Sequence, residues 1–249
     1  MTSQNGDDMS IAQWSNSFAD RESAEFLLKA CHDLRSPIRA MRAHAELMLK
    51  DLSSAKERDW AERLAFIAGG AKRADNVVEG LTQYAIASLL DAGSFRPTPV
   101  DVILRTALAK MSSELRDGNA EVTYGPLPRV NGHPDRLIQV FEHLIANAVR
   151  HRGSAGSRIS IDAELERDTP TGGGALWRFS VRDNGPGIPP NDLEGIFRPF
   201  EKIGAERSGA GLGLTICRLV VERHGGRIWA ESEAGGGATF LFTLPSAED

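Results

Sequence analysis

Two long stretches of the chain repeat apolar residues every three or four positions, the spacing of a helix with one buried stripe. The first stretch covers residues 21–52, and its stripe consists of Leu27, Cys31, Leu34, Ile38, Met41, Ala45, Met48 and Leu52. The stripe of the second consists of Trp60, Leu64, Ile67, Ala71, Ala74, Val78, Leu81 and Ala85. A short turn over residues 51–55 would join them, so the pattern predicts an antiparallel helical hairpin. Pairing two such hairpins into a four-helix bundle would bury all four stripes, which predicts a homodimer.

The pattern changes near Gly93, where this glycine, Pro97 and Pro99 end the second helix and mark a domain boundary. Beyond the boundary, amphipathic helices alternate with strand-like segments. We expect helices over residues 100–116, 134–150 and 211–224, and strands over residues 121–124, 128–131, 158–165, 176–182, 227–232 and 238–244. This order predicts an α/β sandwich with one layer of helices on one mixed sheet. The predicted organisation is a lead-in over residues 1–20, an all-α hairpin over 21–92 and an α/β domain over 93–249.

Composition narrows the classes of function. Charged residues make up 25% of the 249 positions and the net charge is −5, so no polybasic surface for nucleic acid or anionic membrane is expected. Cys31 and Cys217 both fall at apolar helical positions and are predicted to be core residues, not a disulfide or metal pair. No apolar run is long enough to span a membrane and the N-terminus has no signal-peptide layout, so we expect a cytoplasmic protein.

His32 is the first candidate for chemistry. It lies on the flank of the first apolar stripe, Asp33 follows it, and Pro37 comes four residues after Asp33. A proline at that spacing removes the helical hydrogen bond to the Asp33 carbonyl, so the helix is expected to bend just past the histidine. Alone, a histidine on a helix flank is usually a solvated side chain, but an imidazole beside a carboxylate at a bend suits one that must meet other molecules.

Two glycine-rich patterns in the second domain indicate a ligand with phosphate groups. Asp183 ends a strand and can accept a hydrogen bond from an exocyclic amine, while Gly185 and Gly187 let the backbone turn tightly beside it. Residues 208–214 lead into a helix whose N-terminal N–H groups would attract an anion. Each pattern alone is weak and also fits an ordinary loop. The chain has neither a Walker lysine nor a strand–GxGxxG–helix unit, so P-loop and Rossmann sites are excluded.

A third pattern lies on the helix over residues 134–150. Asn147 falls on its apolar side, where an amide left unpaired would cost about 1–3 kcal/mol. A hydrated Mg²⁺ bound to phosphates would be a suitable partner, because that ion takes oxygen ligands and keeps several waters. Arg150, one turn further and followed by His151, could reach the phosphates directly.

In order and spacing, these segments resemble the motif boxes of sensor histidine kinases. The phosphoacceptor box is matched by residues 32–37, the N box by 147–150, the G1 box by 183–187, the F box by 197–200 and the G2 box by 209–214. Residues 141–153 and the ending over 224–229 and 237–240 are most similar to the phytochrome-type branch. Each box is weak alone, but five in this order are specific, and the resemblance covers residues 23–245.

The resemblance implies a dimerisation and phosphotransfer hairpin followed by an ATP-binding domain of the gyrase and histidine-kinase type. It implies that Asp183 binds the adenine amine, that Asn147 holds Mg²⁺ and that Arg150 contacts phosphate. An ATP lid would cover residues 195–210. The remaining nucleotide-binding candidates are His151, Gly185, Gly187, Phe200, Lys202, Gly209, Gly211, Leu212 and Gly213.

The activity that the resemblance implies is that of an ATP-dependent protein-histidine kinase. His32 would take the γ-phosphate of ATP with help from Asp33, and the group would then pass to an aspartate of a response regulator. Ser36 stands where members that also dephosphorylate their partner usually have Thr or Asn, and His143 stands where the family commonly has Asn. Two alternatives remain open: a phosphotransfer scaffold with a vestigial nucleotide domain, and a gyrase-like ATPase, which would need neither the His32 box nor the hairpin.

Overall fold

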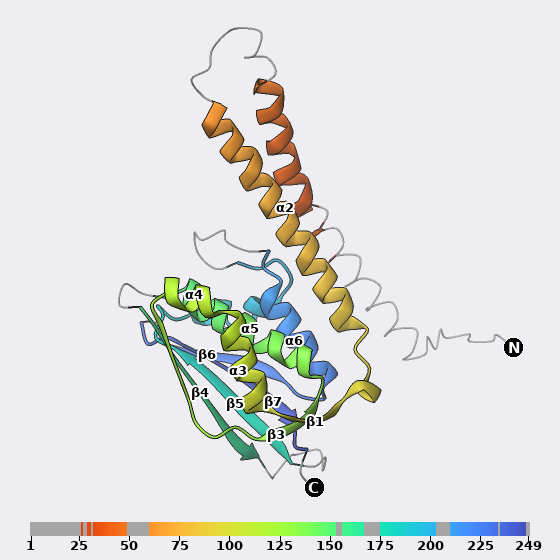
Figure 1. Cartoon of the computed structure of the whole chain (residues 1–249), viewed down its shortest axis with the longest axis vertical. Helices are drawn as coiled ribbons and strands as arrows, with labels where there is room; N and C mark the ends of the chain where they lie inside the picture. Colours follow the sequence, from red (N-terminus) through yellow and green to blue (C-terminus); the bar gives the residue numbers. More distant parts are fainter. Residues whose placement is uncertain are drawn as a thin grey trace, which may run out of the picture. The chain divides into compact units, whose positions relative to one another are not determined.

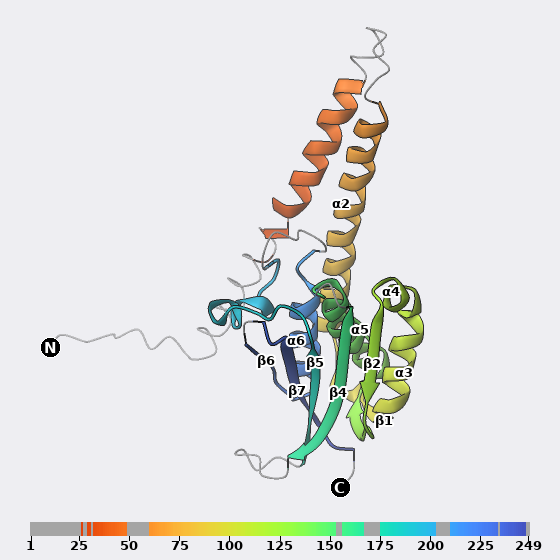
Figure 2. The ribbon, with the colours of Figure 1, turned by 90° about the vertical axis from the view of Figure 1, so that its left-hand side faces the viewer.

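Two helices pack side by side in the N-terminal part of the chain. Residues 32–48 are helical, and helix α2 covers Trp60–Ser88. The rings of His44 and Phe66 stack with their centroids 4.4 Å apart, and a Cβ on Gly70 would lie 2.6 Å from Cγ of Met41. Residue 41 thus lies beside residue 70, while residue 44 lies beside residue 66, so the sequence runs in opposite directions along the two helices. The two helices are antiparallel, as Figures 1 and 2 also show.

This computed structural model describes residues 26, 29–30, 32–48, 60–152, 156–166, 175–202, 210–233 and 235–247. The chain divides into two compact units, residues 1–79 and 80–249. The predicted lead-in over residues 1–20 and the turn over 51–55 lie outside the described residues, and so does Cys31. Across the described ranges, the structure has no helix with the length and apolar character needed to cross a membrane.

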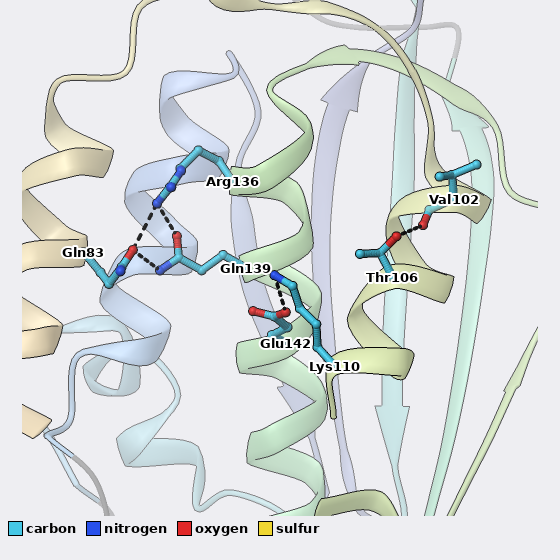
Figure 3. Close-up of polar contacts among 7 residues, drawn as sticks. All are labelled: Gln83, Val102, Thr106, Lys110, Arg136, Gln139 and Glu142. Atoms are coloured by element: carbon cyan, nitrogen blue, oxygen red, sulfur yellow. Dashed lines mark hydrogen bonds and ion pairs between the residues drawn. The ribbon is translucent and has the colours of Figure 1, made fainter. Parts of the chain in front are cut away.

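The division between the units falls inside α2 because the last turns of this helix pack with the residues that follow them. A Cβ on Gly80 would lie 2.6 Å from Cδ1 of Leu212, so a larger residue here would require the Leu212 side chain to shift. Nearby, Oε1 of Gln83 accepts hydrogen bonds from Arg136 at 3.1 Å and from Gln139 at 3.1 Å (Figure 3). The sequence pattern breaks later, at Gly93, which is where the predicted domain boundary lies.

The second unit combines two sheets with a layer of helices. Its elements are η2 (Ala92–Ser94), β1 (Arg96–Pro99), α3 (Val100–Lys110), α4 (Ser112–Asp117), β2 (Ala120–Tyr124), β3 (Arg129–Gly132), α5 (Pro134–Arg150), β4 (Ser157–Glu166), β5 (Leu176–Asp183), η3 (Pro190–Asp192), η4 (Gly195–Phe197), α6 (Gly213–Arg223), β6 (Ile228–Ser232) and β7 (Ala238–Pro245). The larger sheet has the strand order β2-β4-β5-β7-β6, and β1 pairs with β3 in the smaller one. Because β2 is parallel to β4 while the other pairs are antiparallel, the larger sheet is mixed, as predicted.

Two details differ from the expected elements. The helix expected over residues 100–116 is two helices, since α3 ends and α4 begins around the buried Met111, whose φ of −91° and ψ of 13° leave the helical range. Residues 96–99, expected only to end a helix, form strand β1 opposite β3. Prolines suit this position because, within the described ranges, β1 pairs with one strand only. On its other edge no N–H group has to donate to a neighbouring strand, so residues without an N–H are tolerated.

The core lies between the larger sheet and helices α3, α5 and α6, which cover one of its faces (Figures 1 and 2). Phe141 of α5 contacts Phe179 and Phe242 edge-on, with ring centroids 6.4 and 5.7 Å away, and the last two rings stack at 5.0 Å. Lys110 of α3 forms an ion pair with Glu142 of α5 at 3.1 Å (Figure 3). This packing fixes α5, the helix that carries Asn147.

Candidate functional site

His32 is an exposed imidazole held beside a carboxylate. Its side chain is 83% exposed, and its Nδ1 lies 3.2 Å from Oδ1 of Asp33. Ser36, one turn further along the helix, is also exposed. With Nδ1 directed to the carboxylate, Nε2 is the ring nitrogen that remains available to a reaction partner.

Helix α5 presents His143, Asn147 and Arg150 along one side. Residues four and three apart are neighbours on a helix surface, so these three side chains form a single strip. The side chain of Asn147 makes no hydrogen bond within the part of the chain that the structure describes, and Arg150 is exposed. Burial, reinforced by the positive charge of Arg150, lowers the pKa of His143 from 6.5 to about 4. His143 is therefore neutral at pH 7.

The two carboxylate oxygens of Asp183 differ in their hydrogen bonding. Its Oδ1 accepts hydrogen bonds from the backbone N–H of Gly185 at 2.8 Å and of Ala238 at 3.2 Å. Among the described residues, Oδ2 accepts none. The two backbone donors hold the carboxylate in one orientation, so that Oδ2 is positioned to accept from a ligand.

The turn that follows Asp183 is locked to its surroundings. A Cβ on Gly185 would lie 2.8 Å from the His151 carbonyl, and one on Gly187, whose φ is +81°, would lie 2.4 Å from the Glu233 carbonyl. Both glycines are thus required by close backbone approaches. The contact with His151 joins this turn to the C-terminal end of α5, so the strip on α5 and Asp183 belong to one site.

The segment that precedes α6 is hydrogen-bonded to Phe200. The N–H of Phe200 donates to the carbonyl of Gly211 at 2.8 Å, and both residues have positive φ, +62° and +73°. Leu212 is buried, and Gly213 begins α6 beside His143: a Cβ there would lie 3.4 Å from Nδ1 of that histidine. The N-terminus of α6 therefore faces the α5 strip.

The structure brings together most of the predicted nucleotide-binding residues. Those from α5, the Asp183 turn and the segment before α6 line one region, whereas Lys202 is exposed beyond Phe200 and Gly209 lies outside the described residues. Sequence reasoning missed Ser232, whose hydroxyl accepts from the N–H of Ile188 and donates to the Gly237 carbonyl, each at 2.7 Å. No sequence signal marks it, because this bridge depends on the sheet register.

The donor set fits a magnesium ion carried by a nucleotide. Asn147 offers an amide oxygen that makes no hydrogen bond with the described residues, and such an oxygen is the ligand type that Mg²⁺ takes. Within the described ranges no three or more His, Cys, Asp or Glu side chains form a group that could hold a metal ion. An ion at Asn147 would therefore need the phosphates for several of its ligands.

Comparisons with known proteins agree with this geometry. The family model for histidine kinase-, DNA gyrase B- and HSP90-like ATPases matches residues 132–248. Cyanobacterial phytochrome A of Nostoc sp. (strain PCC 7120) is 34% identical over 229 residues, which are 91% of this chain and 29% of that protein. The chain thus spans less than a third of the length of this relative.

Solved structures extend the likeness. The catalytic domain of histidine kinase ThkA is 31% identical and superposes with a TM-score of 0.51 over 61% of this chain and 95% of that domain. ThkA in complex with the response regulator TrrA is 24% identical and shares the fold over 97% of this chain and 68% of that one, with a TM-score of 0.68. Full-length ShkA in complex with AMPPNP is 26% identical over 74% of this chain and 38% of that one, with a TM-score of 0.58. With the five sequence boxes and the α/β fold of residues 80–249, these likenesses show that the chain belongs to the histidine kinase family.

Proposed function

We propose that this chain is the kinase region of a two-component signalling protein. It transfers the γ-phosphate of ATP to His32 and then passes that group to an aspartate of a response regulator. The observation that carries the proposal is the exposed His32 imidazole, whose Nδ1 lies 3.2 Å from Asp33, in a chain that also contains the ATPase fold.

The chemistry follows from the orientation of His32. Asp33 holds the proton on Nδ1, which leaves the lone pair on Nε2 free to attack the γ-phosphorus in line. An N–P bond forms at Nε2 while the bond from the γ-phosphorus to the β–γ bridging oxygen breaks, and ADP leaves. The proton on Nδ1 is stabilised by the Asp33 carboxylate as positive charge develops on the ring.

The second unit supplies binding and positioning, which dominate phosphoryl transfer. Oδ2 of Asp183 accepts from the adenine amine, the N-terminal N–H groups of α6 face phosphate, and Arg150 adds a positive charge. Asn147 and, through the phosphates, the nucleotide itself would hold Mg²⁺. When bound, that ion neutralises phosphate charge.

Two partners complete the proposal. The apolar stripes of the hairpin favour a homodimer in which two hairpins form a four-helix bundle, because Ile38, Leu64 and Val78 are about half exposed in the single chain, at 51%, 53% and 52%. A response regulator is the acceptor, as ThkA was solved with its regulator TrrA. Ser36 is exposed next to His32, where its hydroxyl could orient a water for the reverse dephosphorylation.

Labelling with γ-³²P-ATP and Mg²⁺ tests the kinase activity. The label should be acid-labile and base-stable, as expected of phosphohistidine, and His32→Gln should abolish it while ATP still binds. His44→Gln, a second histidine of the same helix, is the matched control and should be labelled normally. Labelling that survives in His32→Gln would contradict the proposal, and absence of ATP binding would favour the scaffold alternative.

A further inference from the structure

Helix α5 carries a side chain with a buried nitrogen that the proposed reaction leaves unused. Nε2 of His143 is buried and has no hydrogen-bond partner within the described part of the chain. Buried polar groups are usually paired, so this nitrogen is a candidate to bind a ligand.

A second buried histidine shows what a fully satisfied ring looks like in this fold. Nε2 of His224 accepts from the N–H of His133 at 2.9 Å, and its Nδ1 lies 2.7 Å from the carbonyl oxygen of Val220. Its ring also stacks on Phe95 with the centroids 4.2 Å apart. His143 has no such set of contacts among the described residues, so its ring can still take a hydrogen-bond or metal partner.

His143 adjoins the proposed nucleotide site. It lies one turn before Asn147 on α5, and its ring stands against Gly213, the first residue of α6. Thr215, in the first turn of α6, is only 7% exposed, and its hydroxyl oxygen is also buried with no partner in the described ranges. Both helices therefore carry an unpaired polar group close to this contact.

We propose that Nε2 of His143 and the amide oxygen of Asn147 bind the same divalent cation, and that the nitrogen ligand makes this site prefer a transition-metal ion to Mg²⁺. This inference rests on the proposed nucleotide site, since the phosphates must supply further ligands.

Ligand chemistry gives the direction of the preference. Mg²⁺ is bound almost entirely by oxygen, whereas imidazole is a ligand of divalent transition metals. Metal sites often use two ligating side chains four residues apart on one helix, because both side chains then lie on the same side of the helix. The two ligands here are one nitrogen and one oxygen, and this combination disfavours Mg²⁺ relative to Mn²⁺.

Mn²⁺ is a paramagnetic probe that reports its ligands directly. The full chain, labelled with ¹⁵N only in histidine, would be saturated with a nonhydrolysable ATP analogue and Mn²⁺ at pH 8, where an ordinary imidazole is neutral. Pulsed electron paramagnetic resonance should detect coupling between Mn²⁺ and a histidine ¹⁵N. The coupling should be lost in His143→Asn and kept in His44→Asn, which removes a histidine of the hairpin.

Metal competition gives a second readout. Titration of bound Mn²⁺ with Mg²⁺ yields the ratio of the two affinities, and we expect His143→Asn to lower the preference for Mn²⁺ about tenfold, as for loss of a metal-site contact. His44→Asn should leave the ratio unchanged.

The outcomes separate the two proposals. If the analogue binds with Mn²⁺ but the unsubstituted protein shows no histidine ¹⁵N coupling, the role of His143 is overturned and the nucleotide site stands. If coupling is seen but the ratio does not change in His143→Asn, the preference is overturned. If the analogue does not bind at all, both the metal role and the proposed function are wrong.

Discussion

Oδ1 of Asp33 lies 3.2 Å from Nδ1 of His32, the residue that precedes it in the same helix. This contact directs one ring nitrogen to the carboxylate and leaves Nε2 for phosphoryl transfer. The charge of Asp33 therefore acts on the imidazole itself, whereas the residues proposed to bind ATP all lie in the second unit.

Asp33→Asn should slow phosphorylation of His32 while ATP affinity stays the same. The amide can still accept a hydrogen bond from Nδ1, but it has no charge to stabilise the proton as the ring becomes positive. We expect a loss of about 100-fold or more in labelling rate, in the range of a missing general base. Single-turnover labelling measures this, with Glu46→Gln on the same helix as control. Equal rates in Asp33→Asn and the unsubstituted chain would remove Asp33 from the chemistry.

The fixed orientation of Asp183 makes its substitution by asparagine unusually informative. Oδ1 accepts from the N–H groups of Gly185 and Ala238. In Asp183→Asn the amide oxygen must take that place, which turns the new NH₂ group toward the ligand. A donor there would face the adenine amine, which is also a donor. We expect ATP affinity to fall by about 10- to 100-fold, the effect of one unmade buried hydrogen bond.

The same substitution should change which purine is preferred. Inosine triphosphate has a carbonyl in place of the adenine amine and could accept from the new NH₂ group. Binding of the two nucleotides to Asp183→Asn, followed by fluorescence competition, should show a ratio shifted toward inosine. Asp192→Asn, at the last residue of η3, is the control. Unchanged ATP affinity in Asp183→Asn would mean that the adenine site is elsewhere.

Stability should fall on acidification because two histidines are held neutral in the folded chain. Burial lowers the pKa of His143 to about 4 and lowers the pKa of His224 below its usual value. Well above pH 6.5 neither the folded nor the unfolded chain binds these protons, so their contribution to stability is fully present. Below it, the unfolded chain takes up protons that the folded chain excludes, and His143 can cost about 1.4 kcal/mol per pH unit until its folded pKa is reached.

Urea unfolding between pH 7 and pH 5 tests this linkage without ligand or metal. The free energy of unfolding should fall less steeply with pH in His143→Asn than in the unsubstituted chain or in His44→Asn. Carboxylates titrate in all three proteins and cancel in the comparison. Parallel pH profiles for all three would show that His143 is not held neutral by folding.

The proposed homodimer depends on apolar side chains that one chain leaves in water. Ile38 and Leu64 belong to the predicted stripes and are each about half exposed, at 51% and 53%. Replacing both with Glu would place charge in the core of a four-helix bundle, so Ile38→Glu/Leu64→Glu should be monomeric. Leu47→Glu, at an exposed apolar position off the stripe, should remain dimeric. Light scattering measures both, and a monomer from the unsubstituted chain at tens of micromolar would refute the bundle.

Regular periodicity is why so much of the fold could be predicted from the sequence. Helix α5 has the predicted bounds, Pro134–Arg150, because its apolar spacing and its N-terminal proline agree. Strand β1 could not be found, since Pro97 and Pro99 argue against a strand until its partner β3 is known. The break at Met111 was hidden because the apolar spacing continues through α3 and α4.

The candidate site was predictable in its residue types and less so in its contacts. Asp183, Asn147 and the glycines before α6 were visible because their chemistry is unusual at those positions. The bridge made by Ser232 and the packing of His143 against Gly213 depend on contacts between residues far apart in the sequence. Such contacts exist only after the sheet register and the packing of α5 on α6 are set.

The close fit of Gly80 against Leu212 has a consequence for how this chain and its relatives can diverge. The side chain of Leu212 occupies the place that a Cβ on Gly80 would need. A relative with a larger residue at the first position should carry a smaller one at the second, so the two sites should change together during evolution. Natural selection would then act on the combined volume of the side chains at positions 80 and 212 more than on the type of residue at either position.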